Sequence, residues 1–140
     1  MDEKERFEKG RKTRREVLGN EHVQRTEAKL TDFNRPFQEF ITRYAWGEVW
    51  ERPGLTRRER SLITLAMLVA LNREPEFRMH IRAALKNGVT VEEIRELLIH
   101  SGIYCGLPAA NSAIHAAEEV ITEEMQKNQP RMDPPSLNRS

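Results

Sequence analysis

The stretch LITLAMLVAL, from Leu62 to Leu71, constrains the fold more than any other part of the chain. It is too short to cross a bilayer, so it predicts a buried core helix, and no membrane association is expected. Thr56 and Glu59 form a capping-box pattern just before it, which places the helix over residues 57–71. Because this helix is apolar nearly all round, several helices or another subunit must surround it.

The rest of the second half carries clear signals for where helices begin and end. In chain order they are Pro75 at a first turn, Asn87-Gly88 at an end, a second capping-box pattern at Thr90 and Glu93, and Gly106 before Pro108. These signals predict helices over residues 75–87, 91–105 and 108–125.

The first half is less clearly divided. Residues 2–18 are charged with sparse apolar positions and stop at Gly19, and a short helix is predicted over residues 21–30. Pro36 suits the first turn of another helix, which reaches about Tyr44. Its inward side chains are predicted to be Phe37, Phe40 and Ile41. The stretch WGEVWERPG that follows predicts an irregular, aromatic connection.

No stretch alternates apolar and polar residues over the length of a strand. The prediction is therefore an all-α fold, a single-domain bundle of about six helices over residues 1–125. Residues 126–140, QKNQPRMDPPSLNRS, contain three prolines and almost no large apolar side chain. This composition predicts a disordered C-terminal tail.

Charge and cysteine content exclude several classes of protein. The 140-residue chain has 23 basic and 22 acidic residues, so no global field draws it to nucleic acid. Its single cysteine, Cys105, forms neither an intrachain disulfide nor a zinc pattern. The charged opening MDEKERFEKG is no signal peptide, so the cytoplasm is the expected location.

The main candidate site is the pair formed by Glu76 and His80 on the predicted helix 75–87. At this spacing the carboxylate can accept a hydrogen bond from the imidazole, which would raise the histidine pKa toward that of a useful acid. Ala83 leaves open space one turn further on. The same spacing also occurs by chance on exposed helices, and Glu76 is favoured there by the helix dipole.

Other polar residues are weaker candidates. Arg73 lies just before the site helix, and Arg60 belongs to three arginines crowded into one helical turn, which suggests a partner anion, either acidic side chains or a ligand. Tyr104 and His115 could face a pocket, although packing or a subunit contact explains them equally well. The four histidines are spread too widely to predict a metal site.

The residues also resemble a known family. The stretches AWGEVWERPGL, RSLITLAML and HIRAALKNGVTVEEIRELLIHSGIYCGLPAANSAIHAAEEV resemble the 4-carboxymuconolactone decarboxylase family of the β-ketoadipate pathway, and the resemblance covers about residues 1–125. It implies an alkylhydroperoxidase-D-like helical fold and a homo-oligomer, most often a trimer or hexamer. His80 matches the superfamily's site histidine, and Arg73 and Glu76 occupy the positions of its two redox cysteines.

The resemblance implies decarboxylation of 4-carboxymuconolactone, a small carboxylate, to β-ketoadipate enol-lactone and CO₂. The conjugated lactone carbonyl accepts the electrons, so no cofactor or metal is expected. From the residues we infer that His80, tuned by Glu76, donates to the substrate, and that Arg73 and Arg60 hold its retained carboxylate. Tyr104 and His115 are further donors. The alternatives are a non-catalytic oligomeric or ligand-binding module of this fold, or an antioxidant enzyme lacking its thiol pair.

Overall fold

The computed structural model describes residues 1–128, and all their regular secondary structure is helical, which confirms the all-α prediction. There are seven α-helices, one more than the approximate count, because the charged segment near the start is itself a helix. The elements are α1 (Glu3–Leu18), α2 (Asn20–Ala28), α3 (Arg35–Ile41), the π-helical segment η1 (Thr42–Val49), α4 (Arg57–Ala70), α5 (Glu74–Lys86), α6 (Val91–Cys105) and α7 (Leu107–Lys127).

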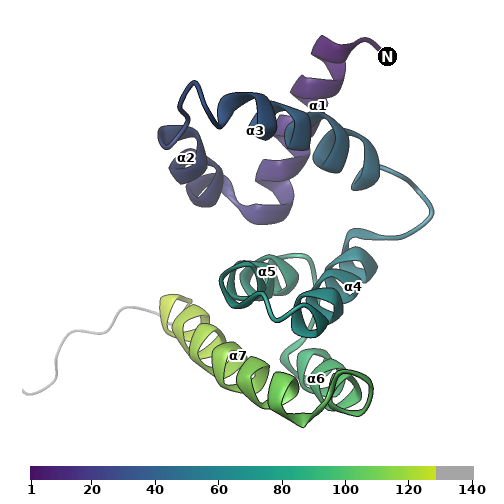
Figure 1. The fold of residues 1–140 in the computed structure, drawn as a ribbon, viewed down its shortest axis with the longest axis vertical. Helices are drawn as coiled ribbons and strands as arrows, with labels where there is room; N and C mark the ends of the chain where they lie inside the picture. Colours follow the sequence, from purple (N-terminus) through teal and green to yellow (C-terminus); the bar gives the residue numbers. More distant parts are fainter. Residues whose placement is uncertain (129–140) are drawn as a thin grey trace, which may run out of the picture.

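The helices form two groups (Figure 1). Helices α1, α2 and α3 with η1 form the first group, and α4 to α7 form the second. Helix α5 links them, because it packs against α4 and α7 on one side and against α1 on the other. Because α5 lies between the two groups, polar side chains on it can be buried by both.

Two apolar clusters hold these groups together. The larger lies among α4 to α7 and is built on Leu65, Ile81 and Ile94, which are almost completely buried. The smaller joins Val17 of α1, Trp46 of η1 and Ala83 of α5. The second cluster therefore fixes the N-terminal group against the helix that carries Glu76 and His80.

The boundaries of the second-half helices agree with their sequence signals. The hydroxyls of Thr56 and Thr90 each accept a hydrogen bond from the backbone N–H three residues on, and the carboxylate of the glutamate there accepts one from the backbone N–H of the capping residue. Gly106 separates α6 from α7 with φ 98°, a conformation that strongly favours glycine. Local chemistry is sufficient to set these ends.

The predicted irregular connection after Tyr44 is wrong over its first half. The chain continues from α3 into η1, where the Trp50 N–H donates to the carbonyl of Ala45, five residues back, at 2.9 Å. The predicted inward orientation of Phe37 and Phe40 is also wrong, since their side chains are 60% and 55% exposed. The wider π turn instead carries Trp46 into the interior.

Helix α1 lies directly against η1, and two glycines allow the close approach. A Cβ on Gly10 would collide with the carbonyl oxygen of Thr42, and one on Gly47 would lie 2.5 Å from the carbonyl oxygen of Arg6. Both obstacles are backbone atoms, so neither can swing aside. The crossing therefore requires glycine on both helices.

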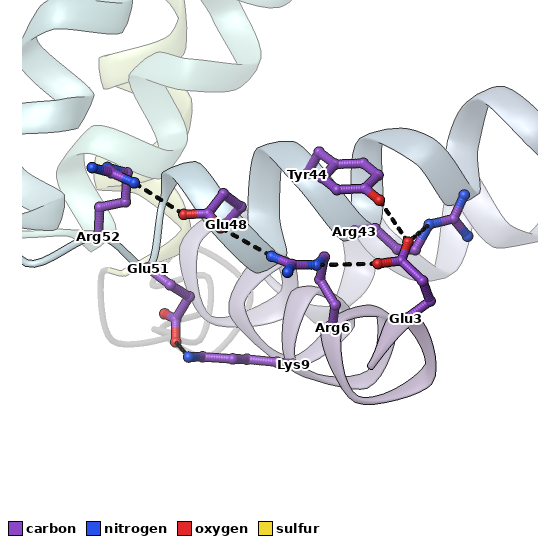
Figure 2. A network of polar contacts seen from close by, with 8 residues as sticks. All are labelled: Glu3, Arg6, Lys9, Arg43, Tyr44, Glu48, Glu51 and Arg52. Carbon is purple, nitrogen blue, oxygen red and sulfur yellow. Dashed lines mark hydrogen bonds and ion pairs between the residues drawn. The ribbon is translucent and has the colours of Figure 1, made fainter. Parts of the chain in front are cut away.

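A network of charged side chains also joins α1 to η1 and the residues after it (Figure 2). Arg6 donates to Glu48 at 2.9 Å, and Glu3 accepts from the Tyr44 hydroxyl at 2.6 Å. The other ion pairs in the figure join Arg6 and Arg43 to Glu3, Lys9 to Glu51, and Arg52 to Glu48. The contacts of Glu3, Arg6 and Lys9 with residues 43–51 are long-range in sequence, so they orient the first helix on the rest of the group.

Helix α4 is only half covered within one chain. Leu65 and Val69 are buried, whereas Met67 and Leu71 are 59% and 69% exposed. One face of the predicted core helix is thus apolar and open.

In residues 1–128 no helix combines the length and apolar character needed to span a membrane. Helix α7 runs to Lys127, and residues 129–140 of the predicted tail lie outside the described residues.

Candidate active site

His80 lies on the face of α5 that turns toward the N-terminal group. Its side chain is buried, with 9% of the residue exposed, and Nδ1 has no hydrogen-bond partner. Burial lowers the pKa of His80 to about 4; the charge of His22 adds to the lowering, and Glu76 opposes it. His80 is therefore a neutral imidazole at physiological pH, and its covered Nδ1 has a hydrogen-bonding capacity that the chain leaves unused.

Glu76 lies one turn before His80, but no hydrogen bond joins the two side chains. Oε1 of Glu76 accepts from Arg73 at 3.1 Å, and Oε2 is covered without a partner. Its own backbone N–H and then Arg73 lower the pKa of Glu76, so it is ionised. The predicted rise in the His80 pKa is wrong, because the cost of burying a cation outweighs the attraction of a neighbouring carboxylate.

His22 is the residue near this site that the sequence does not reveal. Helix α2 places it close enough to His80 for its charge to lower the His80 pKa. The pKa of His22 is itself lowered, first by burial and then by Arg14 and other cations. No spacing rule joins residues so far apart in the chain, and only the packing of the N-terminal group brings them together.

The aromatic motif of the first half forms part of the wall beside the site helix. Trp46 and Trp50 stack with ring centroids 5.0 Å apart, and they belong to the cluster that includes Val17 and Ala83. The open space predicted at Ala83, one turn beyond His80, is therefore absent, because Ala83 is 1% exposed and packed. The small side chain instead lets α1 and η1 approach α5.

The crowded arginines of α4 have protein partners. Arg57 donates to Glu16 and Glu51, and Arg58 pairs with Glu93. Arg60 donates to the backbone carbonyl of Arg52 at 3.0 Å. Of the two alternatives predicted for this turn, acidic side chains account for Arg57 and Arg58, and Arg60 satisfies a carbonyl. Arg73 is the cation that the structure brings next to Glu76, with its side chain 61% exposed.

Tyr104 and His115 lie on the surface of the single chain. Tyr104 is 78% exposed near the end of α6, where its ring stacks on His100 at 5.1 Å, and His115 is exposed on α7. Within residues 1–128, no hydrogen bond or ion pair joins either of them to His80. The same part of the chain has no cluster of three or more side chains suited to hold a metal ion.

The lowered pKa of His80 predicts how stability depends on pH. Between pH 6.5 and 4 the unfolded chain protonates this histidine and the folded chain does not, so the free energy of unfolding should fall as pH falls through that window. The expected contribution is about 3 kcal/mol. Urea unfolding at several pH values would measure it, and His80→Asn should give a flatter profile. If the pH profiles of the two proteins are parallel, the protonation of His80 does not differ between the folded and the unfolded chain.

The chain was also compared with known proteins. The model of the carboxymuconolactone decarboxylase family matches residues 35–119. A 4-carboxymuconolactone decarboxylase of Acinetobacter baylyi is 54% identical, over 88% of this chain and 92% of that protein. The nitrosuccinic acid decarboxylase npaB of Metarhizium robertsii is 42% identical, over 88% and 86%. A 4-carboxymuconolactone decarboxylase of Pseudomonas putida is 56% identical over 34% of this chain and 100% of its own length.

Proposed function

The chain belongs to the carboxymuconolactone decarboxylase family, and we propose that it decarboxylates 4-carboxymuconolactone to β-ketoadipate enol-lactone and CO₂ in protocatechuate degradation. The observation that carries this proposal is the 54% identity to a 4-carboxymuconolactone decarboxylase over nearly the whole of both chains. We place the reaction in the cytoplasm, as part of small-molecule catabolism.

The chemistry of the substrate explains what the protein must supply. The bond between the ring carbon and its carboxylate breaks, CO₂ leaves, and the electron pair moves through the conjugated C=C bond to the lactone carbonyl oxygen. A proton then adds to the ring carbon next to that carbonyl, giving the enol-lactone. The protein must stabilise the developing oxyanion and deliver the proton, and it must not stabilise the leaving carboxylate in the ground state.

His80 suits the first of these tasks. Because it is neutral at physiological pH, its ring N–H donates a hydrogen bond to the oxyanion and does not transfer a proton from an imidazolium. The buried setting strengthens this bond, since few waters compete for the oxygen. Glu76, which is ionised, is not the stored acid. Its Oε2, which has no partner in this structure, offers an acceptor to the imidazole, and the proton for the ring carbon comes from solvent water, which leaves hydroxide to the solvent.

The remaining predicted residues take outer roles in the proposal. Arg73 provides positive charge beside Glu76 and, with Arg60 as a second cation, attracts the anionic substrate toward the site. Tyr104 and His115, which are exposed on one chain, reach a site only from a neighbouring subunit.

The decisive experiment measures CO₂ release by the purified chain from freshly generated 4-carboxymuconolactone, with the non-enzymatic rate as reference. Turnover well above that rate is expected. Nitrosuccinate is the comparison substrate, because a relative that is 42% identical is named for it. Failure to release CO₂ from either acid would favour the non-catalytic module. Peroxide reduction at the expense of a dithiol would instead favour the antioxidant alternative.

We also propose that the chain forms a homo-oligomer, a trimer or hexamer. The support is the open apolar face of α4, which Ile63, Met67 and Leu71 line, and the exposed Ile99 and Ile103 on α6. A hollow of about 570 Å³ lies between these two helices, where Leu62, Ile63 and Leu97 line it together with polar side chains that include three glutamates. A monomer would leave this surface in water at a substantial cost in free energy.

Sedimentation equilibrium at micromolar concentration should therefore give a mass three or six times the chain mass of 16.4 kDa. Replacing Met67 with glutamate should shift the species toward monomer, because it places a charge on the open face. Gln24→Glu is the control, because it adds the same charge at an exposed position on α2, away from the open face of α4. A stable active monomer of the unmodified chain would contradict the proposed assembly.

A further inference from the structure

A polar cavity lies within the N-terminal group, and neither Glu76 nor Arg73 lines it. It has a volume of about 210 Å³ and is enclosed by α1, α2, α3 and the first residue of η1. One part of its lining is apolar, formed by Phe7, Val23 and Leu30. The other part is polar and includes three arginines. Eight of the eleven lining residues are polar or charged, so the cavity suits a small polar or anionic molecule that has a short apolar part.

Arg14 is the unusual member of this lining. Its Nη1 donates to Oε1 of Gln38 at 3.2 Å and to Oγ1 of Thr42 at 3.4 Å, and both acceptors are neutral. Its Nε is covered and has no partner. Burial lowers the pKa of Arg14, and Glu27 offsets this only in part. Among residues 1–128 no carboxylate lies within ion-pair distance of this guanidinium.

The neighbouring arginines of α1 are satisfied differently. Arg11 makes two hydrogen bonds to the carboxylate of Glu27, at 2.8 and 3.1 Å, and Arg6 pairs with Glu48. Arg14 is only partly buried, but its guanidinium has lost hydration that no ion pair offsets. Of the three arginines Arg6, Arg11 and Arg14, only Arg14 bears this cost in free energy, and an anion bound in the cavity would remove it.

The charges of the lining indicate what kind of anion fits. Arg11, Arg14 and Arg35 face Glu27 and Glu39, which leaves one net positive charge. That balance suits a single negative charge better than a doubly charged phosphate. The planar guanidinium matches the geometry of a carboxylate, and the apolar wall can receive a short carbon skeleton.

We propose that this cavity binds one carboxylate group of a small organic acid, with Arg14 as its anchor. The identity of that group rests on the proposed function: it is the carboxylate that the lactone retains. Arg14 suits this task better than Arg73, whose side chain is 61% exposed and already paired with Glu76. The cavity belongs to the N-terminal group, which packs through α1 on α5, the helix that carries His80, so the anchor lies on the side of α5 that His80 faces.

Binding can be tested without turnover, by titrating the full chain with succinate in a calorimeter. Saturable binding is expected, and Arg14→Gln should weaken it at least tenfold. Lys12→Gln is the matched control, because it removes a positive charge from the exposed side of the same helix and should leave binding unchanged. Absence of succinate binding to the unmodified chain, or equal binding by Arg14→Gln, would overturn the proposal. Inorganic phosphate binding more tightly than succinate would also overturn it.

A second variant guards against simple loss of structure. Arg14→Lys keeps the charge but loses the planar fork, so it should keep the thermal midpoint of the unmodified chain and bind succinate with intermediate affinity. Equal weakening by Arg14→Lys and Lys12→Gln would contradict a specific anchor.

Kinetics then test whether the carboxylate is that of the substrate. Arg14→Gln should raise KM for the lactone at least tenfold and change kcat much less, because a retained group is bound alike in ground and transition states. If the unmodified chain binds succinate but releases no CO₂, the proposed function fails while the cavity assignment stands. Turnover with an unchanged KM in Arg14→Gln would overturn the assignment of the retained carboxylate and leave the proposed function intact.

Discussion

Replacing His80 with asparagine should lower kcat for decarboxylation by about a hundredfold or more, with the fold retained. The reason is that a neutral, buried imidazole supplies the hydrogen bond to the developing oxyanion, and loss of one such donor is commonly worth 10²–10³ in rate. Asparagine is preferred to alanine because it fills part of the space and avoids a cavity in a site that is only 9% exposed. Release of CO₂ in single-turnover experiments would measure the chemical step directly.

A matched histidine provides the control for this prediction. His100 lies on α6, where its ring stacks on Tyr104, and it has no assigned part in the reaction. His100→Asn should therefore keep kcat within a few-fold of the unmodified chain. Circular dichroism and the thermal midpoint establish whether each variant is folded. A folded His80→Asn protein with near-normal kcat would show that His80 does not assist the chemistry.

Replacing Gly10 with alanine should destabilise the chain by about 3 kcal/mol or more, because the new methyl group meets the backbone carbonyl of Thr42 on η1. Gly47→Ala should act in the same direction, since its Cβ would lie 2.5 Å from the carbonyl oxygen of Arg6. The two helices must separate to admit either methyl group. Urea unfolding gives the change in free energy, and limited proteolysis of α1 reports whether this helix detaches first.

Gly54 supplies the control for the glycine variants. A Cβ there meets nothing within 4 Å, so Gly54→Ala should leave stability almost unchanged. Unaltered unfolding of Gly10→Ala would mean that α1 does not cross η1 at this glycine. The experiment thus tests the packing of the N-terminal group independently of any activity.

The parts of the fold that the sequence predicts well are those governed by neighbouring residues. The helix predicted over residues 57–71 is observed as Arg57–Ala70, because the capping box at Thr56 acts within one turn. The extent of η1 is not predictable in this way. It depends on a crossing between Gly10 and Gly47, which are far apart in the chain, and no local pattern around Tyr44 reports that contact.

The candidate site shows the same division. The positions of Glu76 and His80 on one helix face follow from their spacing, and the structure places them one turn apart on α5. The protonation state of His80 does not follow from spacing. It is set by burial under the N-terminal group and by the charge of His22 from α2. Spacing predicts which side chains are neighbours, whereas the pKa depends on how much water the whole fold removes.

The π-helical segment has a consequence for which changes in chain length this protein can tolerate. The bond from Trp50 to Ala45 spans one residue more than an α-helical bond, so η1 holds an additional residue within its turn. Deleting one residue between Thr42 and Ala45 would allow an ordinary α-helix to form. It would also rotate every later side chain of the segment by about 100°. Trp46 would turn away from Val17 and Ala83, and Gly47 away from α1. Insertions and deletions should therefore be excluded from this segment, although it lies outside the helix that carries His80.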